Sequence, residues 1–301
     1  MDKALPHIPF LNTGIVIALF GAAIFGIYPT AARAVYADGG SVSLMVGATL
    51  FCRMLTLVAC TRIMRPDEKL FDQKDTRITT FFAGIMQGIG FLCILVAASF
   101  IPGGVVITIV FSYSVLLLFI SAYFGDLQLN FVNLGASFTA LAGLACVMKF
   151  GDIDPAHMTG YLFAGAACLC IMGALYLYGQ LSLKVSPMKL GAESFIIAFL
   201  VALPVLVWQA PELPQTNYGF GMMALCCLAV SIGTIAMFYA IRHLGSYRFS
   251  MFSKMEPVFA TIFGIALIGD DLSPVQYFGI GVVVLSLIAL QLFDKQFHKL
   301  R

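Results

Sequence analysis

Ten long apolar runs divide this sequence almost completely, with short polar, glycine or proline breaks between them. A transmembrane helix needs about 20 apolar residues, and the runs are continuous, whereas membrane β-strands alternate apolar and polar residues. The sequence therefore predicts an all-α integral membrane protein with ten transmembrane helices. They cover residues 14–35, 43–63, 78–98, 104–124, 132–149, 160–181, 190–208, 218–240, 249–269 and 275–293.

The composition excludes most other classes of protein. Of the 301 residues, 60% are hydrophobic and 11% are charged, whereas soluble domains average about 45–50% apolar and about 25% charged. The net charge of +2 argues against nucleic-acid binding. We expect a lipid bilayer and a small-molecule metabolite as the partners.

The distribution of lysine and arginine predicts the orientation of these helices. Membrane proteins keep basic residues in cytoplasmic loops. With a cytoplasmic N-terminus, thirteen of the 17 basic residues lie inside and only Arg33 and Lys149 lie at outside edges. We therefore expect both termini in the cytoplasm of a multi-pass protein of the cell membrane, such as the inner membrane of a bacterium. The inside residues are Lys3, Arg62, Arg65, Lys69, Lys74, Arg77, Lys184, Lys189, Arg242, Arg248, Lys295, Lys299 and Arg301.

A weak internal repeat divides the chain into residues 1–150 and 151–301. A shift of 144 residues aligns seven identical pairs, including Gly125-Asp126 with Gly269-Asp270 and Gly135 with Gly279. Five helices in each half force the halves into inverted orientations, a construction common among secondary transporters. We interpret Asp126 and Asp270 as structural, because each precedes the positive end of the next helix.

Local helix-start signals follow both Gly-Asp breaks. Ser273 to Gln276 forms a capping box with proline at the first helical position, and Asn130 is the expected cap of the corresponding helix in the first half.

These features resemble the drug/metabolite transporter superfamily, specifically its EamA-like exporters. The second half carries the pattern as Glu256-Pro257, Gly269-Asp270 and Gly279. The first half departs from it, because Tyr113 replaces the expected proline, and Arg53 resembles an arginine common at that place. The resemblance implies two EamA-like repeats and an exporter.

Ionisable residues inside predicted helices are costly and mark function or a buried partner, and three stand out. Arg53 is a candidate anion contact, or it pairs with a carboxylate of another helix. Lys254 and Glu256 lie two residues apart, on opposite faces of one helix. Lys254 is a candidate site that could also snorkel to the membrane surface, and Glu256 is a candidate proton or substrate-amine site beside Pro257.

Neutral polar and aromatic residues complete the predicted substrate-binding cavity, although a residue of this kind is more often a packing residue than a ligand contact. Together with Lys254 and Glu256, they favour a neutral, zwitterionic or singly charged molecule with an apolar part, such as an amino acid. The candidates are Tyr28, Gln87, Phe91, Ser112, Tyr113, Tyr176, Gln180, Ser231 and Thr234.

We therefore expect a secondary transporter, not an enzyme, that exports this metabolite by alternating access. No phosphate-binding loop is present, and His7, His157, His243 and His298 lie in loops or tails, so we expect no cofactor and no metal. Proton coupling is an option, and the state is a monomer or a homodimer. The alternatives are a membrane-embedded lipid-modifying enzyme, a receptor or channel, and a transporter of phosphorylated or anionic metabolites.

Overall fold

The computed structural model describes residues 13–148, 157–268 and 271–293, which form α-helices and no strand. The helices are α1 (Thr13–Ala37), α2 (Val42–Met64), α3 (Lys74–Ala98), α4 (Gly103–Phe111), α5 (Tyr113–Tyr123), α6 (Phe131–Val147), α7 (Met158–Ser182), α8 (Pro187–Trp208), α9 (Asn217–Leu244), α10 (Ser246–Phe252), α11 (Met255–Ile268) and α12 (Pro274–Phe293).

Eight helical segments of the described chain are long and apolar enough to cross a membrane, if α4 and α5 count as one. The two remaining predicted spans are less regular. Helix α6 has only 17 residues, and the predicted span 249–269 consists of two short helices, α10 and α11. The structure thus shows a multi-pass helical protein whose predicted fifth and ninth spans are short or interrupted.

The interruption between α10 and α11 follows from Pro257. Proline has no N–H to donate to the carbonyl four residues earlier, and its ring crowds that carbonyl. The carbonyl in question belongs to Ser253, which instead accepts from the N–H of Glu256 at 2.9 Å. The helix is therefore broken at Ser253 and Lys254.

The interruption between α4 and α5 has a different cause, because no proline is present there. The Ser112 hydroxyl donates to the Ile109 carbonyl at 2.6 Å, and the Ser112 N–H bonds to the same carbonyl at 3.1 Å. Serine side chains that bond back to the helix compete with the regular backbone pattern and bend it. The two halves thus reach a similar break through different residues.

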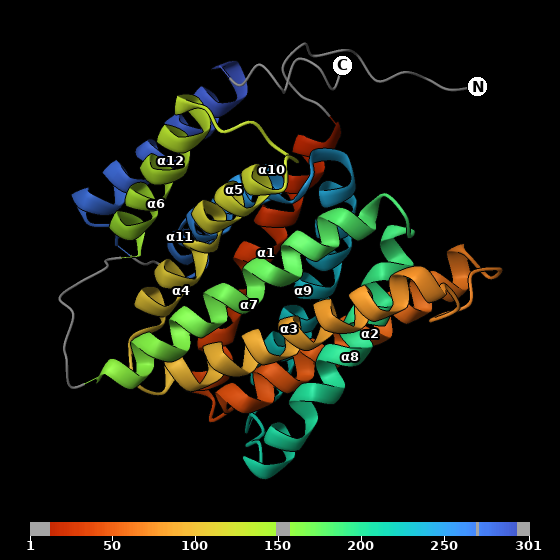
Figure 1. Ribbon diagram of the computed structural model, residues 1–301. Helices are drawn as coiled ribbons and strands as arrows, with labels where there is room; N and C mark the ends of the chain where they lie inside the picture. Colours follow the sequence, from red (N-terminus) through yellow and green to blue (C-terminus); the bar gives the residue numbers. More distant parts are fainter. Residues whose placement is uncertain (1–12, 149–156, 269–270, 294–301) are drawn as a thin grey trace, which may run out of the picture.

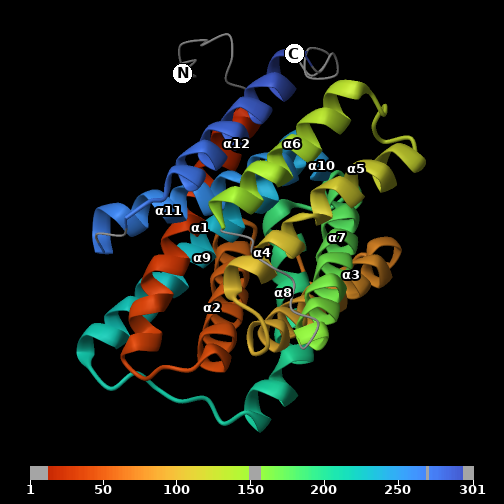
Figure 2. The same ribbon diagram turned by 90° about the vertical axis from the view of Figure 1, so that its left-hand side faces the viewer.

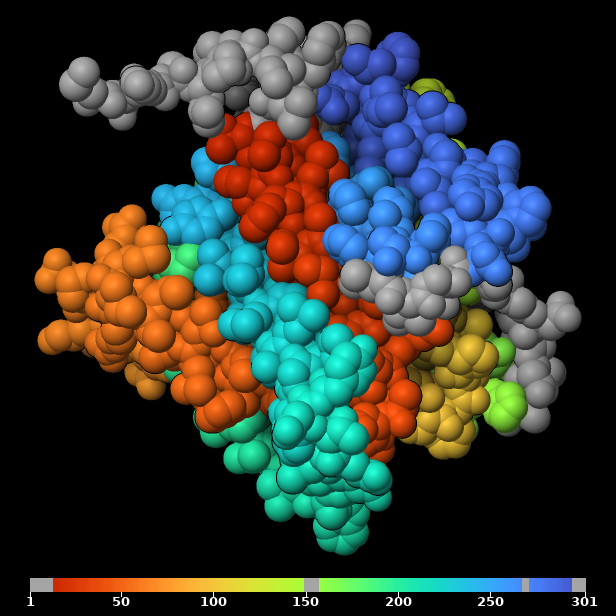
Figure 3. Space-filling model, turned by 180° about the vertical axis from the view of Figure 1, so that it is seen from behind, coloured from red at the N-terminus to blue at the C-terminus, as the bar shows by residue number. Residues whose placement is uncertain are grey.

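Helices of the first half pack mainly against helices of the second half. Helix α1 contacts α9 and α11, α2 contacts α8 and α9, and α3 contacts α7 and α8. In Figure 1, α3 and α7 run alongside each other, and Figure 3 shows α1 in the middle of the opposite face, between α9 and the pair α11 and α12.

Glycine permits the close approach of α3 and α8. A methyl group at Gly84 would lie 2.7 Å from the Cβ of Ile197, and one at Gly88 would lie 2.8 Å from the carbonyl oxygen of Ala198. Small residues of this kind let transmembrane helices make dense van der Waals contact.

Helices α6 and α12 form a pair at one edge of the molecule (Figures 1 and 2). A methyl group at Gly279 would lie 2.6 Å from the carbonyl oxygen of Gly143, whereas nothing lies within 4 Å of one at Gly135. Gly135 and Gly279 align in the sequence repeat, but they have different surroundings. The partner of Gly279 in packing is Gly143.

Local signals set the helix ends as the sequence predicts. The Asn130 side chain accepts from the N–H of Asn133 at 2.7 Å, and the Ser273 N–H bonds to the Gln276 side chain at 3.1 Å. Gly125 and Gly245 follow α5 and α9 with φ of 80° and 77°, a left-handed conformation that favours glycine. Gly269 and Asp270 lie outside the described residues.

Candidate functional site

The two interrupted helix pairs meet at their breaks. The Tyr113 hydroxyl, at the start of α5, lies 2.9 Å from the Ser253 hydroxyl, which follows α10. The next residue on each side repeats the contact, because the Lys254 ammonium donates to the Ser114 hydroxyl. All four residues are buried, so they form a polar link between the two halves inside the protein.

Lys254 is the most deeply buried of the charged candidates. Its relative exposure is 0%, which contradicts the alternative that it snorkels to the membrane surface. Besides Ser114, its Nζ contacts the thioether sulfur of Met251 at 3.4 Å. Both partners are neutral.

Glu256 belongs to a different environment, although it lies only two residues away. It is part of the first turn of α11, and the opposite charge that acts on it is that of Arg53. The sequence-based prediction that Lys254 and Glu256 face different ways agrees with these separate partners.

Arg53 lies in an aromatic pocket between α1, α2, α3 and α8. Its guanidinium carbon is 5.1 Å from the ring centre of Phe91, 5.7 Å from that of Phe195 and 5.8 Å from that of Phe25. Such cation–π contacts stabilise a cation by about 0.5–2 kcal/mol. The Nε atom of Arg53 is buried and has no hydrogen-bond partner among the described residues. Its N–H is therefore an unsatisfied hydrogen-bond donor inside the protein.

Other predicted residues surround this central region or serve packing. Tyr28 interacts electrostatically with Arg53 and with Tyr36, and Gln87 is buried in α3 with 7% exposure. Ser231 is buried in α9 with no hydrogen-bond partner for its hydroxyl among the described residues. The Thr234 hydroxyl donates to the Val230 carbonyl of its own helix at 2.6 Å, so it has no free donor for a ligand.

Two further candidates, Ser112 and Tyr176, lie at opposite ends of α5. The Ser112 hydroxyl lies 3.2 Å from the Cys168 sulfur, besides its bond to Ile109. Tyr176 stacks on Phe124 with ring centres 5.5 Å apart, near the far end of α5 from Tyr113.

Tyr176 and Gln180 line a cavity of about 350 Å³ between the two halves. The Gln180 amide donates to the carboxylate of Asp126 at 2.6 Å, so Asp126 bonds to α7, whereas Asn130 caps α6. The cavity lies at the ends of α5, α7 and α9 and the start of α10. It is lined by Ser121, Asp126, Leu127, Tyr176, Gly179, Gln180, Ser182, Leu183, Ile241, Arg242, His243, Leu244, Gly245, Ser246, Tyr247 and Arg248.

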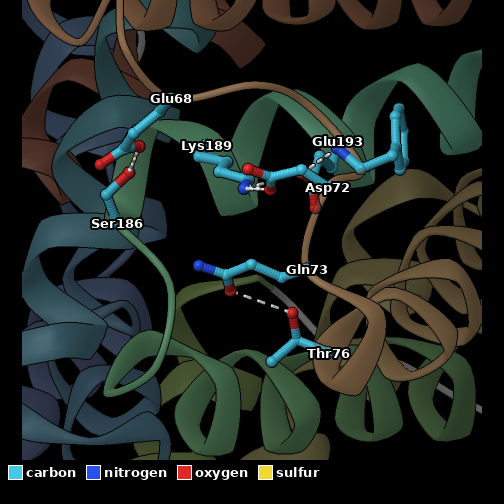
Figure 4. A network of polar contacts seen from close by, with 8 residues as sticks. Glu68, Asp72, Gln73, Thr76, Ser186, Lys189 and Glu193 are labelled. Carbon is cyan, nitrogen blue, oxygen red and sulfur yellow. Dashed lines mark hydrogen bonds and ion pairs between the residues drawn. The ribbon is translucent and has the colours of Figure 1, made fainter.

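A second polar network joins the segment between α2 and α3 to the start of α8 (Figure 4). Lys189 donates to Asp72 and lies 3.8 Å from Glu193, which also accepts from the N–H of Phe71 at 2.7 Å. The Ser186 hydroxyl donates to Glu68. The hydrogen bond from Lys189 lowers the pKa of the exposed Asp72 carboxylate.

Sequence reasoning missed Glu193, a carboxylate with 2% exposure inside a predicted span. Its signal is its position four residues after Lys189, a spacing at which opposite charges on a helix interact. Since its partners are a lysine and a backbone N–H of this chain, its role is to hold the segment between α2 and α3 against α8.

Metal ligands do not cluster in this site. Within residues 13–148, 157–268 and 271–293, no group of three or more histidine, cysteine, aspartate or glutamate side chains could hold a metal ion.

Comparison with known proteins shows the family. No curated protein sequence matches the chain. A crystal structure of another protein superimposes with a TM-score of 0.76 over 92% of this chain and 97% of that one, and at 14% identity this likeness shows the fold alone. The model of the EamA-like transporter family matches twice, over residues 12–149 and 158–291. The chain therefore belongs to the EamA-like transporter family.

Proposed function

We propose that this protein is a secondary transporter whose ten membrane crossings form two inverted five-helix repeats, residues 1–150 and 151–301. The eight long spans, the shorter α6 and the broken pair α10 and α11 supply ten crossings. An even number of crossings places the start of α1 and the end of α12 on the same side of the membrane. In Figures 1 and 2, the beginning of α1 and the end of α12 lie at the same end of the molecule.

Contacts between loops support the predicted sidedness. The loop after α1 bonds to the loop after α8, through Ser41 to Glu212 and through Gln215 to Asp38; both loops are expected outside. The segment between α2 and α3 is expected inside, and it bonds to the start of α8, as Figure 4 shows. These contacts show which loops share a side, and the excess of lysine and arginine in the loops expected inside assigns that side; we therefore propose cytoplasmic termini in a cell membrane, such as a bacterial inner membrane.

The single observation that carries the mechanism is the meeting of the two helix breaks. Discontinuous helices at the interface of inverted repeats are where secondary transporters bind substrate, near the middle of the bilayer. Here Tyr113 and Ser114 come from one half, and Ser253 and Lys254 come from the other. Alternating access would rearrange these contacts as one half moves against the other.

The chemistry around the breaks favours a small amphipathic metabolite that is zwitterionic or singly charged, such as an amino acid. Arg53, Lys254 and Glu256 are the three ionisable groups, and hydroxyl and aromatic groups outnumber them. Membership of the family supports transport, and we propose export as its direction. Glu256 is the group that we propose for proton coupling.

Solute flux into proteoliposomes tests this function. Purified protein should support saturable uptake or exchange of at least one radiolabelled amino acid, and unlabelled amino acids should compete. Lys184→Met, at an exposed loop position, should transport as well as the wild type. Saturable uptake of a sugar phosphate that amino acids do not inhibit would contradict the substrate class, and failure to move any solute would contradict the function.

A further inference from the structure

Lys254 is a fully buried lysine whose contacts among the described residues are with neutral groups. Among the described residues, the ion pairs join Arg65 to Glu68 and Lys189 to Asp72 and Glu193, and none includes Lys254. Glu256, the carboxylate closest in sequence, lies in the first turn of α11 and interacts with Arg53. Burying an ammonium without an opposite charge costs free energy, so this position favours a bound anion.

Hydroxyl groups surround Lys254. Tyr113, Ser114 and Ser253 have 5%, 0% and 7% exposure. The Ser114 hydroxyl donates to the Phe111 carbonyl at 3.1 Å and the Ser253 hydroxyl to the Ser250 carbonyl at 2.9 Å, so the Lys254 ammonium is the group that an anion would engage. One ammonium matches the charge of a single carboxylate. A phosphate dianion would need a second cation beside Lys254, whereas Arg53 sits over three phenylalanine rings and Arg248 lines the cavity near the start of α10.

The cavity between the halves lies at the other end of the short helix that precedes Lys254. Helix α10 lines it at Ser246, Tyr247 and Arg248 and ends at Phe252, two residues before Lys254. Among the described residues, Arg242 and Arg248 line the cavity together with the carboxylate of Asp126.

We propose that Lys254 is the binding site for the carboxylate group of the transported substrate, with Ser114 as the partner that the carboxylate displaces. This proposal rests on the proposed transport function and names its substrate as a carboxylic acid. Because Lys254 now bonds to Ser114 across the two halves, a carboxylate that takes over the ammonium loosens this link. Substrate binding is thereby coupled to the movement of the broken helices.

Paired ligands that differ only in the carboxylate test the proposal on the full-length protein. We would measure thermal stabilisation of the purified chain by each standard L-amino acid and by its carboxamide, since a ligand that binds only the folded protein raises its melting temperature. At least one acid should stabilise the wild type, and its amide should bind roughly tenfold to a hundredfold more weakly, the loss expected for one charge-assisted contact. Stabilisation by no acid, or equal stabilisation by acid and amide, would overturn the proposal.

Three variants assign the effect to Lys254. Lys254→Met should abolish the preference for acid over amide, Ser114→Ala should keep it because the ammonium stays, and Lys184→Met is the matched control at an exposed lysine. If Lys254→Met does not fold, Lys254→Gln provides the same comparison. A preference that survives in the folded variant would overturn the proposal.

Transport assays separate this proposal from the proposed function. Equal uptake of an acid and its amide into proteoliposomes would refute the carboxylate site and leave the transport function intact. Acid binding that depends on Lys254 without any flux would refute transport and leave the binding site intact.

Discussion

At the scale of single residues, the buried charges of this protein differ in what satisfies them. Glu193 and Lys189 pair with each other and with the segment between α2 and α3. Lys254 has a hydroxyl and a thioether as partners, and Arg53 has aromatic rings and the charge of Glu256. Glu193 is held by a hydrogen bond and a lysine within the chain, whereas Glu256 and Lys254 lie at the helix break where the two halves meet.

Glu256→Gln and Glu193→Gln should therefore have opposite effects. Glu256→Gln should abolish or uncouple flux while expression and melting temperature stay close to wild type. Glu193→Gln should lower stability by about 1–3 kcal/mol, because it weakens buried contacts to Lys189 and Phe71, and the folded fraction should still transport. Proteoliposome flux and thermal unfolding measure the two quantities.

Equal and mild effects of both variants would return Glu256 to a structural role. The sequence suggests a comparison with Asp270→Asn as well, which should mainly lower stability, although Asp270 lies outside the described residues.

The ion pair between Asp72 and Lys189 should make stability depend on pH. The pKa of Asp72 is lower in the folded protein than its usual value of 3.8. A lowered folded-state pKa stabilises the fold above the unfolded value, and this contribution is lost as the pH falls through the folded value. Asp72→Asn should thus lower the melting temperature at pH 7, and its difference from wild type should shrink below pH 3.8. A difference that is constant with pH would show that the charge of Asp72 contributes nothing.

At the scale of helices, short interruptions create the polar centre. An unbroken helix satisfies its own backbone and exposes only side chains. The breaks at Ser112 and at Ser253 to Lys254 instead place two pairs of polar side chains opposite one another. A different residue causes each break, a serine hydroxyl in one half and a proline in the other.

Pro257→Ala tests whether the break between α10 and α11 is needed for function. Alanine restores an N–H that can bond to the Ser253 carbonyl, and it favours helix by about 3 kcal/mol relative to proline in a helix interior. We expect unchanged or higher thermal stability and at least a tenfold loss of flux (about 1.4 kcal/mol). Wild-type flux in the stable variant would show that the break is dispensable.

The pair α6 and α12 should depend on the close approach of Gly279 and Gly143. Gly279→Ala places a methyl group 2.6 Å from the Gly143 carbonyl oxygen, so the helices must separate and stability should fall by about 1–3 kcal/mol. Gly135→Ala is the matched control on the open face of α6, where alanine should raise stability by up to about 1 kcal/mol. Thermal unfolding of both variants measures the difference, and equal effects would contradict the packing.

At the scale of the whole molecule, the two halves are interleaved. Helices α1, α2 and α3 pack against α7, α8, α9 and α11, so each half completes the other. The polar centre and the cavity both lie where the halves meet, and movement between the halves would change both.

The proposed topology predicts opposite accessibility for two exposed loop positions. With the native cysteines replaced, Lys69→Cys should react with a membrane-impermeant thiol reagent only from the cytoplasmic side, and Glu212→Cys only from the outside. Asp154→Cys should behave as Glu212→Cys does, although Asp154 lies outside the described residues. Labelling of Lys69→Cys and Glu212→Cys from the same side would refute the topology and the inverted repeats with it.

The sequence by itself determined where the apolar helices lie and several of their ends. Each transmembrane helix needs its own continuous apolar stretch to cross the lipid, whatever its neighbours are. Helix caps such as Asn130 act within a single turn. The same locality explains why Glu193 went unnoticed, because its pairing with the segment between α2 and α3 is not a property of its own helix.

Only the tertiary structure decided which polar residues meet. The contacts of Tyr113 with Ser253 and of Lys254 with Ser114 each join residues 140 positions apart, and the structure moves Tyr176 and Gln180 out to the cavity at the end of α5. The physical reason is that lipid is as apolar as the helix interior, so hydrophobicity does not mark the face that packs inward. Close packing at small residues and bonds between polar side chains select that face, and both depend on the partner helix.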